Sequence, residues 1–535
     1  MGKLNRASYQ LVALTKLLRN GQNSVLIADG VGVGKTIAAG YILAYLVSGG
    51  TPGLVLSPPG LVEKWRIELR DKFGLVGVAV RTAEELSNAE EAWNHNRREL
   101  FVYIVASSLL SRNTVPPFPG ALVIDEIHNY RNASTALWQS AKILTSKTTY
   151  RIGLSATPIN NRLEDLAAEL SLLLKVEIEV ANALIADLWR PGHRQLLYPL
   201  MTRFLKERLG IHFAKRLILD RRIHYPESYA RQALAAIKEK SDRKDNDSVY
   251  LEEITYFRLA ASSPLGLGKT LGVQITGVTD KQDALQTVLN SHSSYHVIVF
   301  CEFEATAREL EMIVNDRQCF RITGSIPVFE RQSLLEQFRV SRNGMLVMTA
   351  VGSEGLDLQF CSVLVNYDLT WNPMILEQRI GRIDRIGQEK STIHIYNFIV
   401  DGSIDDRILR VLGRKLGLVN KSILQTAPIL CNESSNSLSE SAELHPLISE
   451  EVLTNELSEA QQLVRAMEFT SEIIPEDYSI LPHIDDEFCS PEAIFKARAN
   501  GRSQWLQSTS EVERWLSDLD TESEHLKSRL SYYTS

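Results

Sequence analysis

The sequence lacks the cysteine pattern of a disulfide-stabilised or zinc-binding protein. Its five cysteines are scattered, and no two of them have the CxxC spacing of a zinc site. Because disulfide frameworks and structural zinc need paired or clustered cysteines, we expect a reduced, cytoplasmic protein without structural zinc. The cysteines are Cys301, Cys319, Cys361, Cys431 and Cys489.

Long apolar runs are also absent, although hydrophobic residues make up 44% of the 535 residues. No run approaches the roughly 20 residues that a membrane span needs. The first ten residues, MGKLNRASYQ, lack the apolar core of a signal peptide, and Arg6 departs from the myristoylation pattern. We therefore expect a globular protein with no membrane contact, and the length predicts about three or four domains.

The net charge of −7 is unevenly distributed along the chain. Residues 431–535 contain 21 acidic and 7 basic residues, a net charge of −14, so residues 1–430 carry +7. A mildly basic body fits a nucleic-acid partner, although ordinary solvation also explains it. The acidic region includes an amphipathic helical pattern at Glu511–Leu530. It is either a solvated extension or a surface that contacts a protein or competes with nucleic acid.

A phosphate-binding motif follows an apolar strand candidate near the start of the chain. Val25–Ala28 reads as the strand, Asp29–Thr36 (DGVGVGKT) follows it, and a helical run comes next. In such loops, backbone N–H groups and the helix N-terminus hold phosphates, the lysine adds a point charge, and the hydroxyl binds magnesium. The sequence predicts these roles for Lys35 and Thr36, although Asp29 stands where the general pattern has glycine.

A second segment resembles the core of such a loop but lacks its context. Gly266–Thr270 (GLGKT) follows Ser262–Pro264 and not an apolar strand. No strand end is therefore available to position a phosphate-binding loop there. We interpret it as a helix terminus and turn.

Paired carboxylates end another apolar strand candidate, at Asp125 and Glu126. In a nucleotide site the first carboxylate reaches magnesium and the second acts as general base on the attacking water. About thirty residues later, Gly153–Pro158 (GLSATP) supplies the hydroxyls of Ser155 and Thr157. The order of these segments favours a nucleotide site over ordinary loop starts.

Residues 378–388, QRIGRIDRIGQ, read as a helix with two faces. One face is an apolar stripe that comprises Leu376, Ile380 and Ile383. Gln378, Arg382 and Arg385 repeat the same spacing on another face, and Gly381 lies between. Two outward guanidiniums suit a phosphate charge that a partner surface supplies. The alternative is a solvated charged helix.

Strand and helix candidates alternate in two parts of the chain. This alternation in residues 1–175 and 280–420 fits parallel sheets with crossover helices. Residues 176–279 read as mostly helical. Within them, the basic run Met201–Arg222 either contacts a phosphate backbone or solvates one face of a helix with an apolar stripe.

Taken in order, these motifs resemble those of superfamily 2 helicases, and among them the Swi/Snf-type ATPases with their bacterial RapA-like branch. In the first half the matching segments are Gln10, Asp29–Thr36, Leu56–Pro59 with Trp65, Val105–Leu109, Asp125–His128 and Gly153–Asn161. In the second half they are Val297–Glu302, Thr323–Phe338, Thr349–Leu358, Asp368–Pro373 and Gln378–Gln388. The family often has an acidic residue at the position of Asp29. Asp357 departs from the asparagine that is common in eukaryotic members.

The resemblance covers roughly residues 4–175 and 280–415. It implies an α/β fold of two tandem RecA-like parallel-sheet lobes with a helical insertion and an acidic, mostly helical C-terminal extension. The expected domains are residues 1–175, 176–279, 280–420 and 421–535.

The resemblance also implies that ATP and Mg²⁺ bind between the two lobes. The residues implied in catalysis are Lys35, Asp125, Glu126, Arg382 and Arg385, with Thr36 and Asp125 on the metal and the two arginines as arginine fingers. The residues implied in nucleotide binding are Gln10, Asp29, Gly30, Gly32, Gly34, Lys35, Thr36, Gly355, Asp357 and Gln378. Nucleic-acid contacts are implied at Pro58, Ser107, Thr349 and Trp371.

The function implied is an ATP-dependent motor on nucleic acid. The resemblance favours a translocase on double-stranded DNA that remodels or displaces protein–DNA complexes without separating the strands, with protein partners in a larger assembly. One alternative is the motor subunit of a DNA-defence or restriction system. Another is an ATP-gated clamp that binds DNA without productive translocation.

Overall fold

A computed structural model describes residues 8–95, 101–111, 117–156, 163–188, 193–206, 209, 213–241, 249–275, 279–313, 317–349, 356–370, 373–406, 408–409 and 510–534. The chain divides into two compact units. Unit 1 comprises Met1–Ile211 and Arg465–Ser535, and unit 2 comprises His212–Val464.

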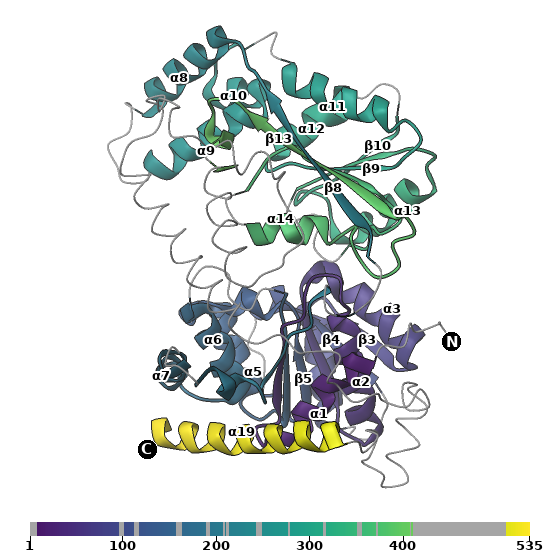
Figure 1. Ribbon diagram of the computed structural model, residues 1–535, viewed down its shortest axis with the longest axis vertical. Coiled ribbons are helices and arrows are strands. Elements are labelled where there is room, and N and C mark those ends of the chain that lie inside the picture. Colours follow the sequence, from purple (N-terminus) through teal and green to yellow (C-terminus); the bar gives the residue numbers. More distant parts are fainter. Residues whose placement is uncertain are drawn as a thin grey trace. The chain divides into compact units, whose positions relative to one another are not determined.

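Unit 1 is built on a seven-stranded sheet in the order β3-β4-β2-β5-β6-β1-β7, and the strand pairs are parallel (Figure 1). Strands β1, β2 and β5 are buried along their whole length because they consist almost entirely of apolar residues. The strands are β1 (Ser24–Ile27), β2 (Gly53–Ser57), β3 (Val76–Val80), β4 (Phe101–Ala106), β5 (Ala121–Ile124), β6 (Tyr150–Leu154) and β7 (Met201–Thr202).

Helices cover both faces of this sheet, α1 to α3 on one and α5 to α7 on the other (Figure 1). They are α1 (Val12–Arg19), α2 (Lys35–Ser48), α3 (Val62–Phe73), α4 (Ala83–His95), α5 (Ala136–Thr145), α6 (Leu163–Leu174) and α7 (Ile178–Leu188). Short 3-10 helices are η1 (Ser8–Leu11), η2 (Pro59–Leu61), η3 (Ser107–Leu109), η4 (Ile127–Tyr130) and η5 (His193–Leu197). The last helix of the chain, α19 (Ser510–Thr534), packs against α1, α7 and η5.

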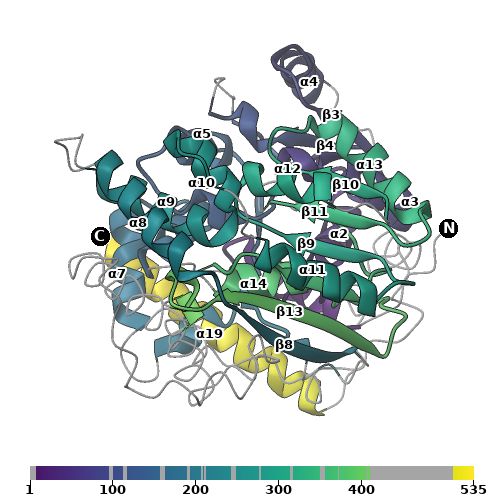
Figure 2. The same ribbon diagram turned by 90° about the horizontal axis from the view of Figure 1, so that it is seen from above.

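Unit 2 has a six-stranded sheet in the order β10-β11-β9-β12-β13-β8, again with parallel pairs (Figure 2). Its strands are β8 (Lys215–Ile223), β9 (Val297–Phe300), β10 (Cys319–Ile322), β11 (Met345–Met348), β12 (Val363–Asn366) and β13 (Thr392–Val400). Its helices are α8 (Glu227–Ser241), α9 (Val249–Ser262), α10 (Pro264–Leu271), α11 (Asp280–Ser291), α12 (Glu304–Ile313), α13 (Val328–Val340) and α14 (Pro373–Ile380).

Strand periodicity explains why helices cover both faces of the second sheet. In β9, Ile298 and Phe300 belong to the core that contains α13 and α14, whereas Val297 and Val299 belong to the core that contains α11 and α12. Successive side chains of a strand point to opposite faces, so a continuous apolar strand must be covered twice. The expectation of two parallel α/β sheets with crossover helices is confirmed.

The expectation that residues 176–279 are mostly helical is wrong for Met201–Arg222. This run supplies β7 to the first sheet and β8 to the second. The nine residues of β8 pair in register with β13, and this long-range pairing outweighs the helical spacing of the leucines. Helices α8, α9 and α10 do lie in this region. The segment Gly266–Thr270 lies within α10, capped by the side chain of Ser263, so it is not a phosphate-binding loop.

Candidate active site

The predicted motifs of unit 1 follow the carboxyl ends of neighbouring parallel strands. The loop Asp29–Thr36 follows β1, and Asp125–His128 follows β5. Ser155 follows β6, Pro58 follows β2, and Ser107 follows β4. Because these strands are parallel and adjacent, all five groups lie at one edge of the sheet, which is where ligands bind in open α/β sheets.

The loop after β1 has the geometry of an anion site. Gly32 and Gly34 have φ of 78° and 101°, a left-handed conformation that favours glycine. Helix α2 begins at Lys35, and Thr36 lies in its first turn. The Nζ atom of Lys35 donates to the carbonyl oxygens of Asp29 (3.1 Å) and Gly30 (3.3 Å). Backbone N–H groups, a helix N-terminus and a cation therefore converge on one loop.

Asp29 has a structural reason to stand where the general pattern has glycine. Its buried Oδ1 accepts hydrogen bonds from Thr202 Oγ1 and from the backbone N–H of Phe204, both at 3.0 Å. The N–H of Gly30 donates to the carbonyl oxygen of Phe204 at 2.8 Å. The carboxylate therefore ties the loop to the segment that follows β7.

Gln10 lies against the same loop and is 5% exposed. A Cβ atom on Gly34 would lie 2.7 Å from Gln10 Nε2, and the positive φ of Gly34 also disfavours any other residue there. The Gln10 Oε1 atom is buried without a hydrogen-bond partner in the described part of the chain. Buried polar atoms are nearly always paired, so this acceptor fits the amino group of an adenine ring.

Asp125 is held by two donors at the end of β5. Trp65 Nε1 donates to Oδ2 at 2.8 Å, and the Glu126 backbone N–H donates to Oδ1 at 2.9 Å. Burial, together with the neighbouring charge of Glu126, raises the pKa of Asp125 to about 7. A divalent cation relieves such a buried charge, so the carboxylate fits magnesium together with the hydroxyl of Thr36.

Glu126 has a left-handed backbone with φ of 48°, which is uncommon for a residue other than glycine. Such strain clusters at active sites. Its Oε2 lies 3.4 Å from His128 Nδ1, and this oxygen makes no hydrogen bond within the described residues. His128 Nδ1 also lies 3.2 Å from Ser155 Oγ, and burial lowers the pKa of His128. A carboxylate oxygen beside a neutral imidazole fits a group that orients water.

In unit 2, the expected helix over residues 378–388 is wrong beyond its first turn. Helix α14 ends at Ile380, and turns follow up to Gly387, where φ is 98°. Gly381 follows the last helical residue and disfavours continuation, and the side chain of Asp384 forms a buried ion pair with Arg216. The expected apolar stripe is confirmed, since Leu376, Ile380 and Ile383 are fully buried.

Two predicted motif segments of unit 2, Thr349–Leu358 and Gln378–Gln388 (the arginine segment), contact each other directly. The backbone N–H of Leu358 donates to the carbonyl oxygen of Arg382 at 3.1 Å. Arg385 forms an ion pair with Asp357. Gln378 lies on α14 and is partly exposed, and Thr349 is buried directly after β11. Gly355, Trp371 and Thr157 lie outside the described residues.

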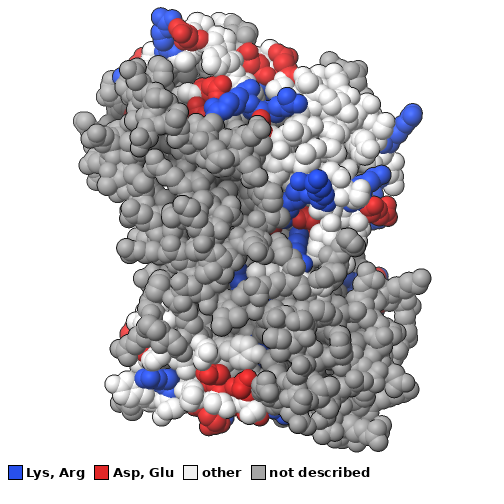
Figure 3. All heavy atoms as spheres, in the orientation of Figure 1, with Lys and Arg blue, Asp and Glu red and all other residues white. Residues whose placement is uncertain are grey.

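The basic run Met201–Arg222, for which phosphate contact was one of two interpretations, is divided between β7 of unit 1 and β8 of unit 2. Arg216 is buried, with both carboxylate oxygens of Glu377 at 2.7 Å and Asp384 Oδ2 at 2.7 Å. Arg203 is buried and donates to the carbonyl oxygen of Ala28, directly before the loop Asp29–Thr36, which we call the phosphate loop. Burial lowers the pKa of Arg203 to about 10. On the face shown in Figure 3, some Lys and Arg side chains of the described residues lie beside Asp and Glu, and others lie singly.

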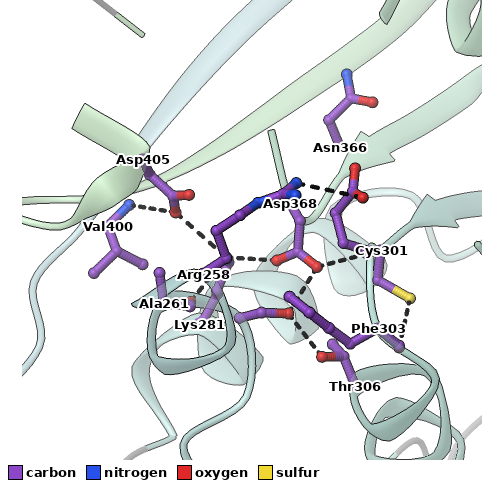
Figure 4. A network of polar contacts seen from close by, with 12 residues as sticks. Arg258, Ala261, Lys281, Cys301, Phe303, Thr306, Asn366, Asp368, Val400 and Asp405 are labelled. Atoms are coloured by element: carbon purple, nitrogen blue, oxygen red, sulfur yellow. Dashed lines mark hydrogen bonds and ion pairs between the residues drawn. The ribbon is translucent and has the colours of Figure 1, made fainter. Parts of the chain in front are cut away.

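A buried polar network in unit 2 surrounds Asp368 (Figure 4), and it contacts α14 through Arg379. Asp368 accepts hydrogen bonds from Ser262 Oγ at 2.7 Å and from Lys281 Nζ at 3.1 Å. Arg379 of α14 donates to the Asp368 carbonyl oxygen at 2.8 Å and to Glu302 Oε1 at 2.7 Å. These contacts therefore hold α14, which leads into the turns that carry Arg382 and Arg385. Glu302, Asp368 and Arg379 lie in motif segments that the sequence marked, whereas Ser262 and Lys281 lie outside those segments.

None of the helices in the described residues is long and apolar enough to cross a membrane.

Comparisons with known proteins match both units. Residues 9–190 match the SNF2-related domain, and residues 280–387 match the helicase conserved C-terminal domain. The chain is 29% identical to the uncharacterized ATP-dependent helicase YqhH of Bacillus subtilis, covering 82% of this chain and 83% of that protein.

Longer relatives are matched over part of their length. Identity is 27% to the ISWI chromatin-remodeling complex ATPase CHR17 of Arabidopsis thaliana, covering 78% of this chain and 42% of that protein. The chain is 26% identical to the RNA polymerase-associated protein RapA of Pectobacterium carotovorum, covering 68% of this chain and 45% of that protein. The chain thus spans less than half the length of these two relatives.

Among solved structures, the Hef helicase domain of Pyrococcus furiosus aligns with a TM-score of 0.44 and 17% identity, covering 74% of this chain and 96% of that chain. The SWI2/SNF2 ATPase core of Sulfolobus solfataricus in complex with dsDNA aligns with a TM-score of 0.35 and 18% identity, covering 78% and 92%.

Proposed function

Because the chain is an SNF2-related, helicase-like ATPase, we propose that it is an ATP-driven translocase on double-stranded DNA that remodels or displaces protein–DNA complexes. The observation that carries this proposal is the arrangement at one sheet edge of unit 1. A phosphate-binding type of loop follows one strand, and two carboxylates follow another; one oxygen of the second carboxylate makes no hydrogen bond within the described residues.

In this proposal unit 1 binds ATP and Mg²⁺. Lys35 and the N–H groups of the loop hold the phosphates, while Gln10 accepts from the adenine amino group. Thr36 and Asp125 hold Mg²⁺, which when bound neutralises charge on the phosphate oxygens. Glu126 orients the attacking water and accepts its proton.

Unit 2 contributes the arginines in this proposal. Arg382 and Arg385 stabilise the charge that develops on the transferred phosphoryl group, and an arginine finger accelerates hydrolysis by about 10³–10⁵-fold. Turnover then requires that both units close on one ATP. The ion pair of Arg385 with Asp357 exchanges for a phosphate contact in that closed state.

Contacts with DNA are proposed at the neighbouring strand ends. Ser107 and Pro58 lie at the edge of the sheet in unit 1 that also carries the phosphate loop, and Thr349 follows β11 in unit 2. Contacts with phosphates carry no sequence information, so targets are selected by partners. Relatives named as chromatin-remodeling and RNA polymerase-associated proteins support a DNA-bound protein complex as the target.

The proposal is tested by DNA-stimulated ATP hydrolysis with wild type and Glu126→Gln. We expect duplex DNA to stimulate the wild type, and Glu126→Gln to lose at least about 10²-fold in turnover while it retains ATP binding. Glu84→Gln, an exposed carboxylate on α4, is the matched control and should retain activity. Absence of stimulation by duplex DNA contradicts the motor.

Two further assays separate the classes of motor. A translocase displaces a triplex-forming strand from duplex DNA in an ATP-dependent manner and leaves a forked duplex paired. Unwinding of the fork indicates a strand-separating helicase. Hydrolysis without triplex displacement indicates a clamp.

A further inference from the structure

The last helix of the chain is docked on the unit that carries the phosphate loop. Three contacts hold α19 there. Leu526 is fully buried in the main core of unit 1, Asp520 pairs with Arg19 at 2.9 Å, and Arg529 lies 3.7 Å from the buried carboxylate of Asp187. In Figure 1, α19 runs beside α1 and α7. Residues near the C-terminus therefore contribute to the packing of the nucleotide-binding unit.

Leu519 of α19 packs at a different place from Leu526 and Leu530 of the same helix. Leu519 is fully buried, and it belongs to a small apolar cluster separate from the main core. We call this set the loop cluster; its other members are Tyr9, Val12, Val33, Phe204 and Leu209.

The loop cluster is bonded directly to the phosphate loop. Tyr9 Oη donates to the carbonyl oxygen of Val33 at 2.5 Å, and Val33 is itself a residue of the loop. The carbonyl oxygen of Phe204 accepts a hydrogen bond from the N–H of Gly30, and the N–H of Phe204 donates to Asp29 Oδ1. The Nε2 atom of Gln10 lies 3.5 Å from Tyr9 Oη. Movement of this cluster therefore moves the loop and the adenine-reading glutamine together.

We infer that Leu519 of α19 is a positioning residue for ATP, holding Tyr9 and Val33 so that Gln10 and the phosphate loop keep their binding geometry. This inference rests on the proposed function. Leu519 is not a residue of the phosphate loop, so its effect is indirect and passes through the loop cluster. Truncating Leu519 leaves a cavity in the loop cluster, which collapses only in part. A smaller fraction of the molecules then holds Gln10 and the phosphate loop in the geometry that binds ATP. Apparent affinity falls by the same fraction as that population.

The test compares two leucines of the same helix in the full chain. Leu519→Ala removes the contact with the loop cluster, whereas Leu526→Ala removes an equally buried leucine from the main core. ADP binding is measured by calorimetry well below the melting temperature, and thermal unfolding is recorded for each protein. We expect both variants to melt earlier. Leu519→Ala should bind ADP about tenfold more weakly, whereas Leu526→Ala should change affinity less than twofold.

A merely structural role gives a different result. Equal ADP affinity in both variants, whether reduced or unchanged, overturns the inference. If Leu519→Ala does not fold, Leu519→Val against Leu526→Val replaces the pair, and the same comparison decides. Failure of the wild type to bind ADP overturns the proposed function, whereas unchanged affinity in the Leu519 variant overturns only this inference.

Discussion

At the scale of single residues, Asp125 is the most informative group in unit 1. It is buried beside Glu126, and these two facts raise its pKa to about 7. The hydrogen bond from Trp65 Nε1 opposes this effect because it favours the charged form. Proton and magnesium therefore compete for one carboxylate close to neutral pH.

Trp65→Phe should shift this competition toward the proton. Losing a hydrogen bond to a charged group raises the pKa of Asp125 by about one unit. We expect the Mg²⁺ concentration for half-maximal ATPase activity to rise about five- to tenfold at pH 7, and to approach the wild-type value near pH 9. Trp138→Phe is the control, because Trp138 donates its indole N–H to a backbone carbonyl. An unchanged Mg²⁺ requirement at pH 7 contradicts this role.

Asp125→Asn should stabilise the protein when Mg²⁺ is absent. Between about pH 4 and 7 the native state binds more protons at this site than the unfolded state, whose pKa is about 3.9. The free energy of unfolding therefore falls as pH rises through this window, and the cost is fully present above pH 7. We expect a higher melting temperature at pH 8, by roughly 2–4 °C per kcal/mol relieved, and a smaller gain at pH 5.5. A gain independent of pH argues against a buried charge at Asp125.

At the scale of elements, β8 shows how tertiary pairing changes the meaning of a basic run. Arg216 lies on this strand, and its side chain is 3% exposed between Glu377 and Asp384. It therefore fixes α14 and the turn that carries Arg382. The exposed arginine on the same strand, Arg221, has no such role in the described contacts.

Arg216→Ala should destabilise unit 2, because it removes the ion pairs that a buried guanidinium makes with Glu377 and Asp384. We expect the free energy of unfolding to fall by about 3–5 kcal/mol in urea titrations. Arg221→Ala should change it by less than about 0.5 kcal/mol. If Arg216→Ala instead weakens DNA binding while the unfolding curve is unchanged, the residue is a phosphate contact and the buried pairing is wrong.

The sequence predicted those parts of the site whose residues all lie within one short segment. The loop after β1, the carboxylates after β5 and the buried stripe of α14 each depend on residues within one segment. Partners far apart in the sequence were not predictable in this way. Asp29 with Phe204, Arg216 with Glu377 and Leu519 with Tyr9 meet only when the chain has folded. The end of α14 at Ile380 was missed because the apolar spacing of Leu376, Ile380 and Ile383 continues past it into the turns.

At the scale of the whole molecule, the groups that we propose for catalysis are divided between two units that each have their own sheet and core. Unit 1 holds the phosphate loop and both carboxylates. Unit 2 holds the arginine segment, joined to Asp357 and anchored through Arg379. Neither unit has the full set, so hydrolysis should report on their cooperation.

The most direct test of this account is the rate of DNA-stimulated ATP hydrolysis in Arg382→Ala and Arg385→Ala, measured beside duplex-DNA affinity. The account predicts that each variant loses about 10³-fold or more in turnover and keeps its DNA affinity within a few fold. Arg342→Ala, an exposed arginine of unit 2, is the control and should retain turnover. Wild-type turnover in both arginine variants would contradict the shared site.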